Sequence, residues 1–246
     1  MNDLDAIITP AKGKHSPQLG PVAVVAGSET DLFQLCKSLD FDSGLYTKLF
    51  TSRLYHTPAD APAGRISITG PVVGAPYAVI VLETLIASGA KKILFLGWCG
   101  SICEKVKIGD IILATSAVID EGTSGHYNEK EASRSFPSAS MLAMLNNALE
   151  QNQVNFHNGA IWTTDAIYRE TSEKVKYFQR EDAICVEMEI SALFTVAKFR
   201  GVDLAAMAVV SDELASFKWR PGFKMDAFKH GRETACMVIK DLCRKI

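Results

Sequence analysis

Short apolar runs that alternate with longer segments of helical periodicity constrain this chain more than any other feature of its sequence. Buried strands are predicted for "PVAVVAG" (Pro21 to Gly27) and "KKILFLGWCGS" (91–101). A helix ended by a glycine is predicted between them, in "APYAVIVLETLIASGA" (Ala75 to Ala90). This alternation predicts an α/β fold, and we expect one domain over residues 1–246 with a mixed, twisted central sheet flanked by helices.

Composition and charge narrow the class of partner. The chain has 246 residues, is 48% hydrophobic and carries a formal net charge of -2, without any block of lysines and arginines. This balance argues against nucleic acid or an anionic membrane as the main partner. The N-terminal stretch "MNDLDAIITPAKGKH" has acids where a signal peptide needs bases, and no apolar run approaches the roughly 20 residues of a membrane span. We therefore expect a cytoplasmic protein.

The cysteines do not predict a metal site. Cys99 and Cys103 form a C-x3-C pair, but no second pair and no clustered histidines accompany it. Structural zinc sites use four such ligands at close spacing. The six cysteines are therefore expected to be reduced thiols, and no bound metal is expected.

Glycine and polar residues follow several of the predicted strands. A ligand site in an α/β sheet commonly lies outside the carboxyl ends of its strands. Each of these ends taken singly is explained by the need for a turn. Together they predict a site at this edge, formed by 27–29, Gly70, 97–101, 163–165, 187–189 and 211–213.

The stretch "ICVEMEISALFTVAKF" places two carboxylates, Glu187 and Glu189, inside an apolar run. An acid in apolar surroundings costs several kcal/mol unless a donor or a counter-charge meets it. Alternation along an extended backbone puts both side chains on one face, at a strand-to-helix junction. One interpretation is that a carboxylate stabilises the start of the helix. The other is that a carboxylate accepts hydrogen bonds from the vicinal diol of a sugar.

An ordered series of motifs carries a family resemblance from about Val22 to the C-terminal helix. The series contains "GWCGS", a strand into "GD", "IDEGTSGHY", "IWTTDAIYRE", "VEME" and "SD" at a strand end. It resembles the nucleoside phosphorylase and nucleosidase superfamily. The resemblance implies cleavage of an N-glycosidic bond, with the sugar transferred to phosphate or to water. It further implies homo-oligomers (dimers or trimers of dimers), and no cofactor beyond inorganic phosphate as a co-substrate.

The resemblance also implies roles for single residues. Glu189 would bind the ribose 2'- and 3'-hydroxyls, with Met188 against the sugar and Glu187 in support. His126, in the loop segment "EGTSGHY", could reach the 5' end of the sugar or the acceptor, and the alternative is a solvated loop histidine. Asp212 would be the general acid that protonates the departing base, a contribution typically worth a factor of roughly 10² to 10⁴. An aspartate at this place favours a purine over a pyrimidine.

The base is expected in a slot near "IWTTDAIYRE". The residues that correspond to the base contacts of the family are Trp162, Thr164, Asp165 and Tyr168. Ile167 occupies a place that is often aromatic in purine phosphorylases. Stacking would then come from Tyr168 or Trp98.

The acceptor end departs from the family pattern. Phosphorylases hold phosphate with arginines, whose guanidinium is bidentate and permanently charged. The first motif is a glycine followed shortly by an arginine. Here Gly27 is followed by Glu29 and Asp31, without a basic residue.

The second expected arginine is absent as well. Its place before Gly97 holds Phe95, and Trp98 stands where the family has a small hydroxyl residue. A third cation, contributed by the neighbouring subunit, corresponds to Lys48 or Arg53.

These departures leave the reaction open between three alternatives. Carboxylates near an incoming phosphate disfavour it by roughly 1 kcal/mol or more per close pair. Hydrolytic relatives use a glutamate near the first-strand glycine to activate water, a part that Glu29 or Asp31 could take. The loops could also bring in a cation from Arg134, Arg169 or His126. We expect phosphorolysis from the "EGTS" and "WTTD" segments, with hydrolysis as the alternative and a non-catalytic nucleoside-binding module as the third.

Overall fold

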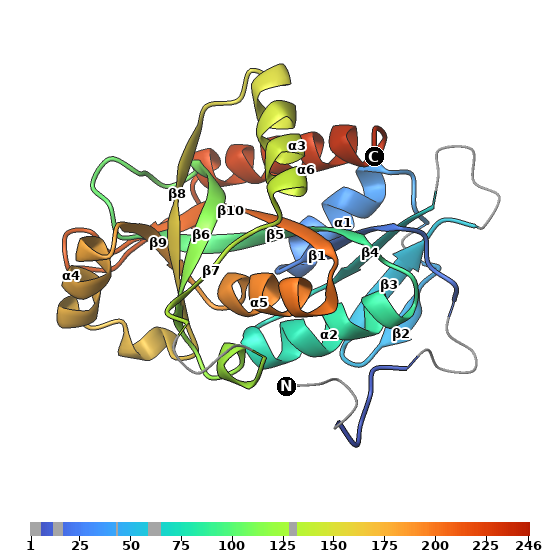
Figure 1. Ribbon diagram of the computed structural model, residues 1–246. Coiled ribbons are helices and arrows are strands. Elements are labelled where there is room, and N and C mark those ends of the chain that lie inside the picture. The colour runs from blue at the N-terminus through green and yellow to red at the C-terminus, as the bar shows by residue number, and fades with distance from the viewer. Residues whose placement is uncertain (1–5, 12–16, 43, 59–64, 128–131) are drawn as a thin grey trace.

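A mixed sheet covered by helices on both faces forms the body of the protein (Figure 1). The computed structural model describes residues 6–11, 17–42, 44–58, 65–127 and 132–246. The mixed α/β architecture expected from the sequence is confirmed.

The two predicted strands and the helix predicted between them are present. The strands are β1 (Val22–Ala26), β2 (Thr47–Leu49), β3 (Ser52–His56), β4 (Ile66–Gly70), β5 (Lys92–Ser101), β6 (Ile111–Asp120), β7 (Arg134–Ser135), β8 (Phe156–Thr164), β9 (Ala183–Glu187), β10 (Asp203–Glu213) and β11 (Arg220–Pro221). The helices are α1 (Glu29–Ser38), α2 (Ala75–Ala87), α3 (Ala139–Gln151), α4 (Ser172–Arg180), α5 (Ile190–Arg200) and α6 (Asp226–Cys243), with short 3-10 turns at Ser124–His126 and Ile167–Arg169.

The sheet closes on itself at one end. Strand β5 pairs with β1, β9 and β10, and the path from β10 through β6 and β8 returns to β9. Both β10 and β6 contain a register shift, at Val210/Asp212 and at Ala114/Ser116. Such bulges increase the local twist and bend a strand, which helps a sheet to curl. The expected twisted sheet is therefore open on the β4–β2 side and closed on the β8–β9 side.

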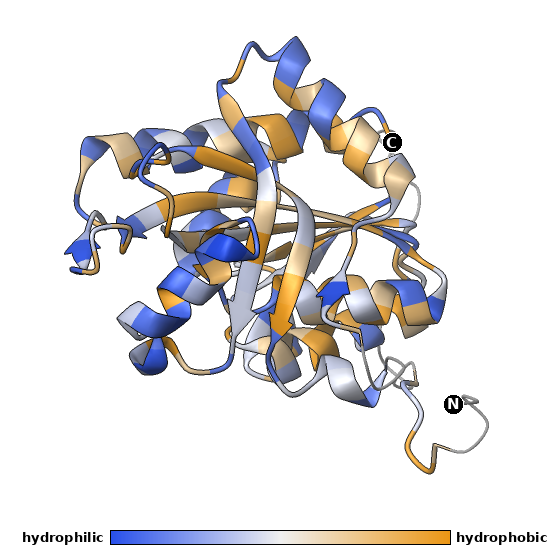
Figure 2. Ribbon diagram, turned by 60° about the vertical axis from the view of Figure 1, so that its left-hand side comes forward, coloured by the Kyte–Doolittle hydropathy of each residue, from blue (hydrophilic) through white to orange (hydrophobic). Residues whose placement is uncertain are grey.

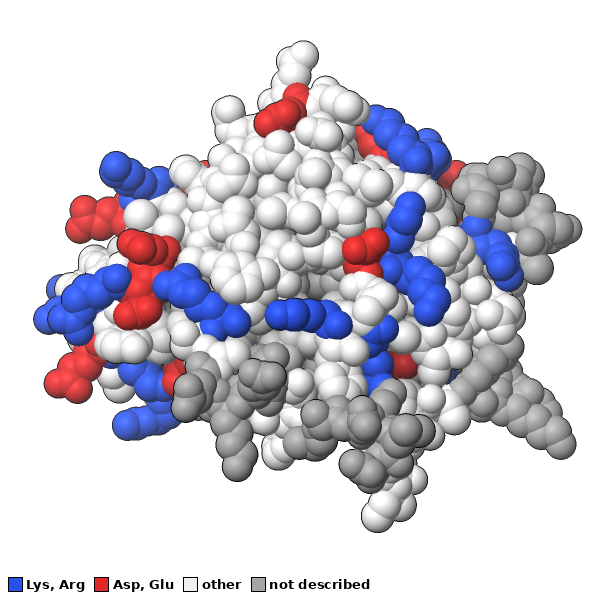
Figure 3. Space-filling view, viewed as in Figure 1, with Lys and Arg blue, Asp and Glu red and all other residues white. Residues whose placement is uncertain are grey.

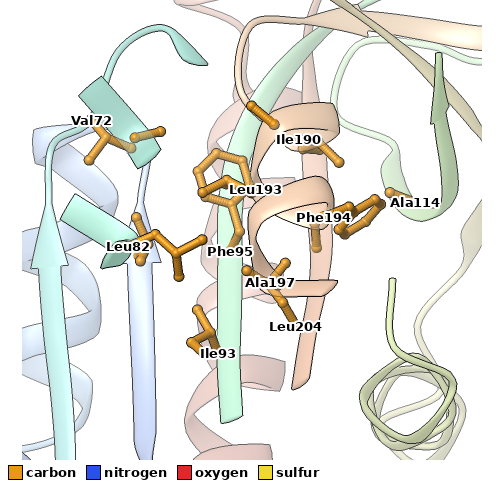
Figure 4. Close-up of a cluster of buried hydrophobic side chains, with 14 of the residues drawn as sticks. Val72, Leu82, Ile93, Phe95, Ala114, Ile190, Leu193, Phe194, Ala197 and Leu204 are labelled. Carbon is orange, nitrogen blue, oxygen red and sulfur yellow. The ribbon is translucent and has the colours of Figure 1, made fainter. Parts of the chain in front are cut away.

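Alternate residues of the central strands supply two separate cores. Ile93 and Phe95 of β5 face the helices α2 and α5, whereas Leu94 and Leu96 face α1, α3 and α6. Figure 4 shows Phe95 pointing from β5 toward Leu193 of α5. Each fully buried side chain of this size contributes about 1.5–3 kcal/mol. The apolar strands run through the middle of the molecule, between these two layers (Figure 2).

Helix α5 follows the "VEME" stretch and is buried on all sides. Every residue from Ile190 to Ala197 is buried, because α5 packs on α2, β6 and β10. The helix ends at Gly201, whose φ of 65° is the left-handed conformation that favours glycine. The start of α5 is thereby held rigidly at the edge of the sheet.

On the face seen in Figure 3, Lys and Arg side chains lie across the middle with Asp and Glu side chains between and around them, and the area above them carries few charges. Within the described residues, no helix combines the length and the apolar character needed to cross a membrane.

Candidate functional site

A pocket of about 230 Å³ lies where β1, β5, β9 and β10 end. Four of the six predicted strand ends contribute to its lining, through Gly27, 98–100, 186–189 and 211–212. The other two, Gly70 and 163–165, do not line it. The loop between β4 and α2 adds Val72 and Val73.

Glu187 holds the start of helix α5. Its Oε2 accepts hydrogen bonds from the N–H groups of Glu189 (2.6 Å) and Ile190 (2.8 Å), and its Oε1 accepts one from the Thr163 hydroxyl (2.5 Å). Only 5% of the residue is exposed. Burial and the neighbouring Glu189 raise the pKa of Glu187 above the usual range, against the effect of these hydrogen bonds. The helix-start interpretation of the two carboxylates thus applies to Glu187.

Glu189 faces the pocket, with Met188 beside it in the lining. Its Oε1 accepts a hydrogen bond of 2.5 Å from the backbone N–H of Gly74, and 8% of the residue is exposed. Gly74 has a φ of 82°, a conformation that other residues adopt only with strain, so a glycine is needed to aim this N–H at Glu189. Burial raises the pKa of Glu189, and the Gly74 hydrogen bond opposes that rise. Glu189 is therefore held in position by the Gly74 N–H and lines the pocket, where a ligand can contact it.

A bulge in β10 places Asp212 in the pocket. Val210 pairs with Cys99 and Asp212 with Gly100, so Ser211 is the extra residue. The Ser211 hydroxyl donates to Asp212 Oδ1 (2.6 Å), and the Trp219 indole N–H donates to Oδ2 (2.9 Å). A Cβ on Gly100 would lie 3.2 Å from Oδ2, so the glycine permits this close approach.

Glu170 joins Asp212 at the same end of the pocket. The pKa of Glu170 is raised to about 7, first by burial and then by the negative charge of Asp212, with Lys174 opposing. Sequence reasoning missed this residue, although "IYRE" places a carboxylate two positions after Tyr168. Phe223, which also lines the pocket, was missed because it lies in the loop after the last strand.

The raised pKa of Glu170 predicts a specific pH dependence of stability. Its folded pKa of about 7 exceeds the ordinary value of 4.5, so the contribution of Glu170 to the free energy of unfolding is full below pH 4.5 and is lost as the pH rises through 7. Glu170→Gln should flatten this decline. Between pH 4.5 and pH 7 the free energy of unfolding should fall by about 1–2 kcal/mol less in the variant than in the parent. This figure allows for solvent screening of the half-buried carboxyl group. Urea unfolding at a series of pH values measures it.

Glu104→Gln is the matched control, because Glu104 is exposed. It should keep the pH slope of the parent protein. Equal slopes for Glu170→Gln and the parent would contradict the prediction.

The ionisable side chains that line the pocket, apart from the thiol of Cys99, are all carboxylic acids. Its described lining contains four carboxylates (Glu170, Glu187, Glu189 and Asp212) and no lysine, arginine or histidine. Among the described residues, no group of three or more His, Cys, Asp or Glu side chains is arranged to hold a metal ion. From this chain alone, the pocket offers hydrogen-bond acceptors and acids but no cation.

Asp31 does not reach the pocket. It is fully buried, and its Oδ1 is paired with Arg232 Nε of α6 at 2.7 Å. Its Oδ2 accepts hydrogen bonds from the Ser28 hydroxyl (2.7 Å) and the Trp98 indole N–H (2.6 Å). Both oxygens of Asp31 are occupied by partners within the fold, so Asp31 has a structural role. The expectation that Asp31 lies at the acceptor site is therefore wrong.

Of the other residues expected at the acceptor end, two line the pocket and four do not. Gly27 and Trp98 line the pocket. Glu29 is exposed and paired with Arg53 at 2.7 Å, and Lys48 is exposed on β2, so none of these three lines the pocket of its own chain. Gly97 also lies outside the lining, and a Cβ there would come within 2.7 Å of the Phe95 ring, which gives this glycine a packing role.

The residues expected to hold the base lie outside the pocket lining. Trp162 is a core residue, 0% exposed, stacked on Phe178 with ring centroids 4.2 Å apart. Thr164 is buried, Asp165 accepts the Gly122 N–H at 2.9 Å, and Tyr168 is 96% exposed. Of that segment, Ile167 and Glu170 enter the lining, because the 3-10 turn at Ile167–Arg169 directs them there.

His126 lies in a second pocket of about 570 Å³, beside Tyr127, Phe199 and the N-terminal segment. Within one chain it therefore does not reach the pocket that holds Glu189. The cause is the position of the 3-10 turn Ser124–His126, which packs against helix α5.

The chain is similar to known proteins both in sequence and in structure. The family model described as the phosphorylase superfamily matches residues 21–244. Guanosine phosphorylase of Halorubrum lacusprofundi is 29% identical over 195 residues, which are 79% of each chain. In structure, the chain resembles uridine phosphorylase of Vibrio fischeri (TM-score 0.81, 23% identity, covering 96% of this chain and 98% of the other). It also resembles the 5'-methylthioadenosine/S-adenosylhomocysteine nucleosidase of Helicobacter pylori (TM-score 0.76, 18% identity, 93% and 99% covered).

Proposed function

The chain belongs to the phosphorylase superfamily, a family of nucleoside phosphorylases and nucleosidases, and on that premise we propose that it cleaves the N-glycosidic bond of a purine nucleoside with water as the acceptor. One observation carries the choice of water. The described lining of the pocket holds four carboxyl groups and no lysine, arginine or histidine, so it offers a phosphate dianion no cationic partner, and each carboxyl group that is ionised repels it. Water meets no such barrier.

The sugar end of the proposed complex rests on Glu189. One carboxylate oxygen of Glu189 is held by the Gly74 N–H, and the residue lines the pocket. Its carboxylate can therefore accept hydrogen bonds from two vicinal hydroxyls. Met188 offers an apolar contact for the face of the ribose. As the bond breaks, positive charge develops on the sugar, and the carboxylate of Glu189 stabilises it electrostatically.

The base end rests on Asp212 and Glu170. Protonation of a purine ring nitrogen by Asp212 allows the base to leave as a neutral molecule. Glu170, whose pKa is raised to about 7, carries a proton for part of the time at neutral pH and faces the same end. Ile167, Val186 and Phe223 supply apolar walls for the ring. Overall, the C–N bond to the base breaks, a water oxygen bonds to the anomeric carbon, and the proton that this water loses replaces the one that Asp212 gave to the base, so that one water is consumed and the free base and free ribose are released.

Phosphorolysis is the second candidate, and the relative named guanosine phosphorylase favours it. It would require a cation from outside the described lining. Lys48 or Arg53 of a neighbouring copy could supply one, because both stand at the surface on β2 and β3. A homo-oligomer is therefore part of this alternative.

The test is base release with and without phosphate. The purified protein is freed of phosphate and incubated with inosine, guanosine, adenosine, methylthioadenosine and uridine. Chromatography follows the free base, and phosphorus NMR detects ribose 1-phosphate. We expect purine release at the same rate with or without phosphate, and no ribose 1-phosphate.

Release only in the presence of phosphate would overturn the choice of water and support phosphorolysis. Tight binding of a nucleoside without release would overturn catalysis altogether and support a binding module. Asp212→Asn serves as the control for contaminating activity, because true activity should fall with it.

A further inference from the structure

A cation lies directly behind the pocket wall. Arg232 of α6 pairs with the buried Asp31 at 2.7 Å, and 12% of the arginine side chain is exposed. Its Nη2 is buried and has no hydrogen-bond partner among the described residues. Buried donors of this kind are rare, because an unmade hydrogen bond costs the full desolvation of the group.

Trp98 is the residue that touches both this cation and the pocket. Its ring lies 5.2 Å from the Arg232 guanidinium carbon, and its indole N–H donates to Asp31 at 2.6 Å. Trp98 also lines the pocket next to Gly27, whereas Arg232 does not line it. Phe228 packs edge-on against Trp98 at 5.0 Å and keeps the ring in place.

We propose that Trp98 determines the acceptor of the reaction by sealing Arg232 from the pocket, and that removing the ring opens a subsite for a tetrahedral oxyanion such as inorganic phosphate. This inference rests on the proposed hydrolysis, in which water and not an anion attacks. The seal has two parts. The indole fills the space in front of the guanidinium, and Asp31 occupies its Nε.

A guanidinium suits a tetrahedral oxyanion because its donors form a planar fork that two anion oxygens can match. In the parent protein the Nε is used by Asp31, and the Nη2 is buried without a hydrogen-bond partner among the described residues. A smaller residue at 98 would empty the space that the indole fills beside the guanidinium, and so connect that group to the pocket. With an asparagine at 31, the competing negative charge would be gone as well.

The experiment compares two double variants that differ only in the bulk at one position. Trp98→Val/Asp31→Asn removes the ring, and Trp98→Phe/Asp31→Asn keeps one. Both are titrated with inorganic phosphate by calorimetry, without any nucleoside, so the result does not depend on catalysis. We expect the valine variant to bind phosphate at least tenfold more tightly than the phenylalanine variant or the parent. Adding Arg232→Gln to the valine variant should abolish that binding.

Equal phosphate affinity in the valine and phenylalanine variants would overturn the proposal, and so would binding that survives Arg232→Gln. If the double variants do not fold, the single variants Trp98→Val and Trp98→Phe decide in the same way. Failure of the proposed hydrolysis would appear separately, as phosphate-dependent base release by the parent protein.

Discussion

Asp212→Asn is expected to lower the turnover of purine nucleosides by a factor of roughly 10² to 10⁴, the usual contribution of a positioned general acid. The asparagine keeps the size of the side chain, and its amide oxygen can still accept one of the two hydrogen bonds that Asp212 accepts from Ser211 and Trp219. It cannot deliver a proton to the departing base. The loss should therefore appear in kcat more than in KM, which steady-state kinetics of base release measures.

Glu213→Gln is the matched control. Glu213 is the next residue of β10, but it pairs with Arg220 at 3.2 Å and lies outside the pocket lining. We expect its turnover to stay within about twofold of the parent value. A similar loss in both variants would point to a general disturbance of β10, and an unchanged rate in Asp212→Asn would exclude the acid role.

Arg232→Met should lower the free energy of unfolding by about 3–5 kcal/mol, the range found when one partner of a buried ion pair is removed. Asp31 is 0% exposed, so without Arg232 its negative charge would remain buried with two neutral donors, Ser28 and Trp98. Methionine keeps most of the volume of the arginine stem, which limits the cavity. Urea unfolding at neutral pH measures the change.

A pair whose arginine is exposed provides the comparison. Arg220 lies 3.2 Å from Glu213, with 60% of the arginine and 15% of the glutamate side chain exposed, and a pair that solvent screens in this way contributes about 0–1 kcal/mol. Arg220→Met should therefore have little effect. Equal effects of Arg232→Met and Arg220→Met would show that the pair with Asp31 is not important for stability.

The two carboxylates of "VEME" illustrate how far local sequence reasoning reached. Their position at a strand-to-helix junction was predictable, because alternation and helical periodicity are local properties of the chain. Two interpretations remained open, the start of the helix and a ligand. The structure gives the first to Glu187, which accepts two N–H groups of α5, and turns Glu189 toward the pocket.

Trp162 and Glu170 illustrate the opposite case within one short segment. Trp162 lies in β8 and Glu170 directly after the 3-10 turn that follows it. Yet Trp162 stacks on Phe178 in the core, whereas Glu170 lines the pocket. Which of them enters the pocket depends on where α4 packs against β8 and β9. That packing depends on side-chain contacts between separate elements, which the periodicity of a single segment cannot predict.

By itself, the sequence determined the alternation of strands and helices, the edge of the sheet where the site lies, and the absence of the usual arginines after Gly27 and before Gly97. These are features of local pattern and of residue identity. The tertiary structure alone decided that four acids line one pocket, and that Arg232 packs against the ring of Trp98 outside that pocket. Arg232 and Asp31 are 201 residues apart in the chain, and their pairing exists because α1 and α6 pack on the same face of the sheet.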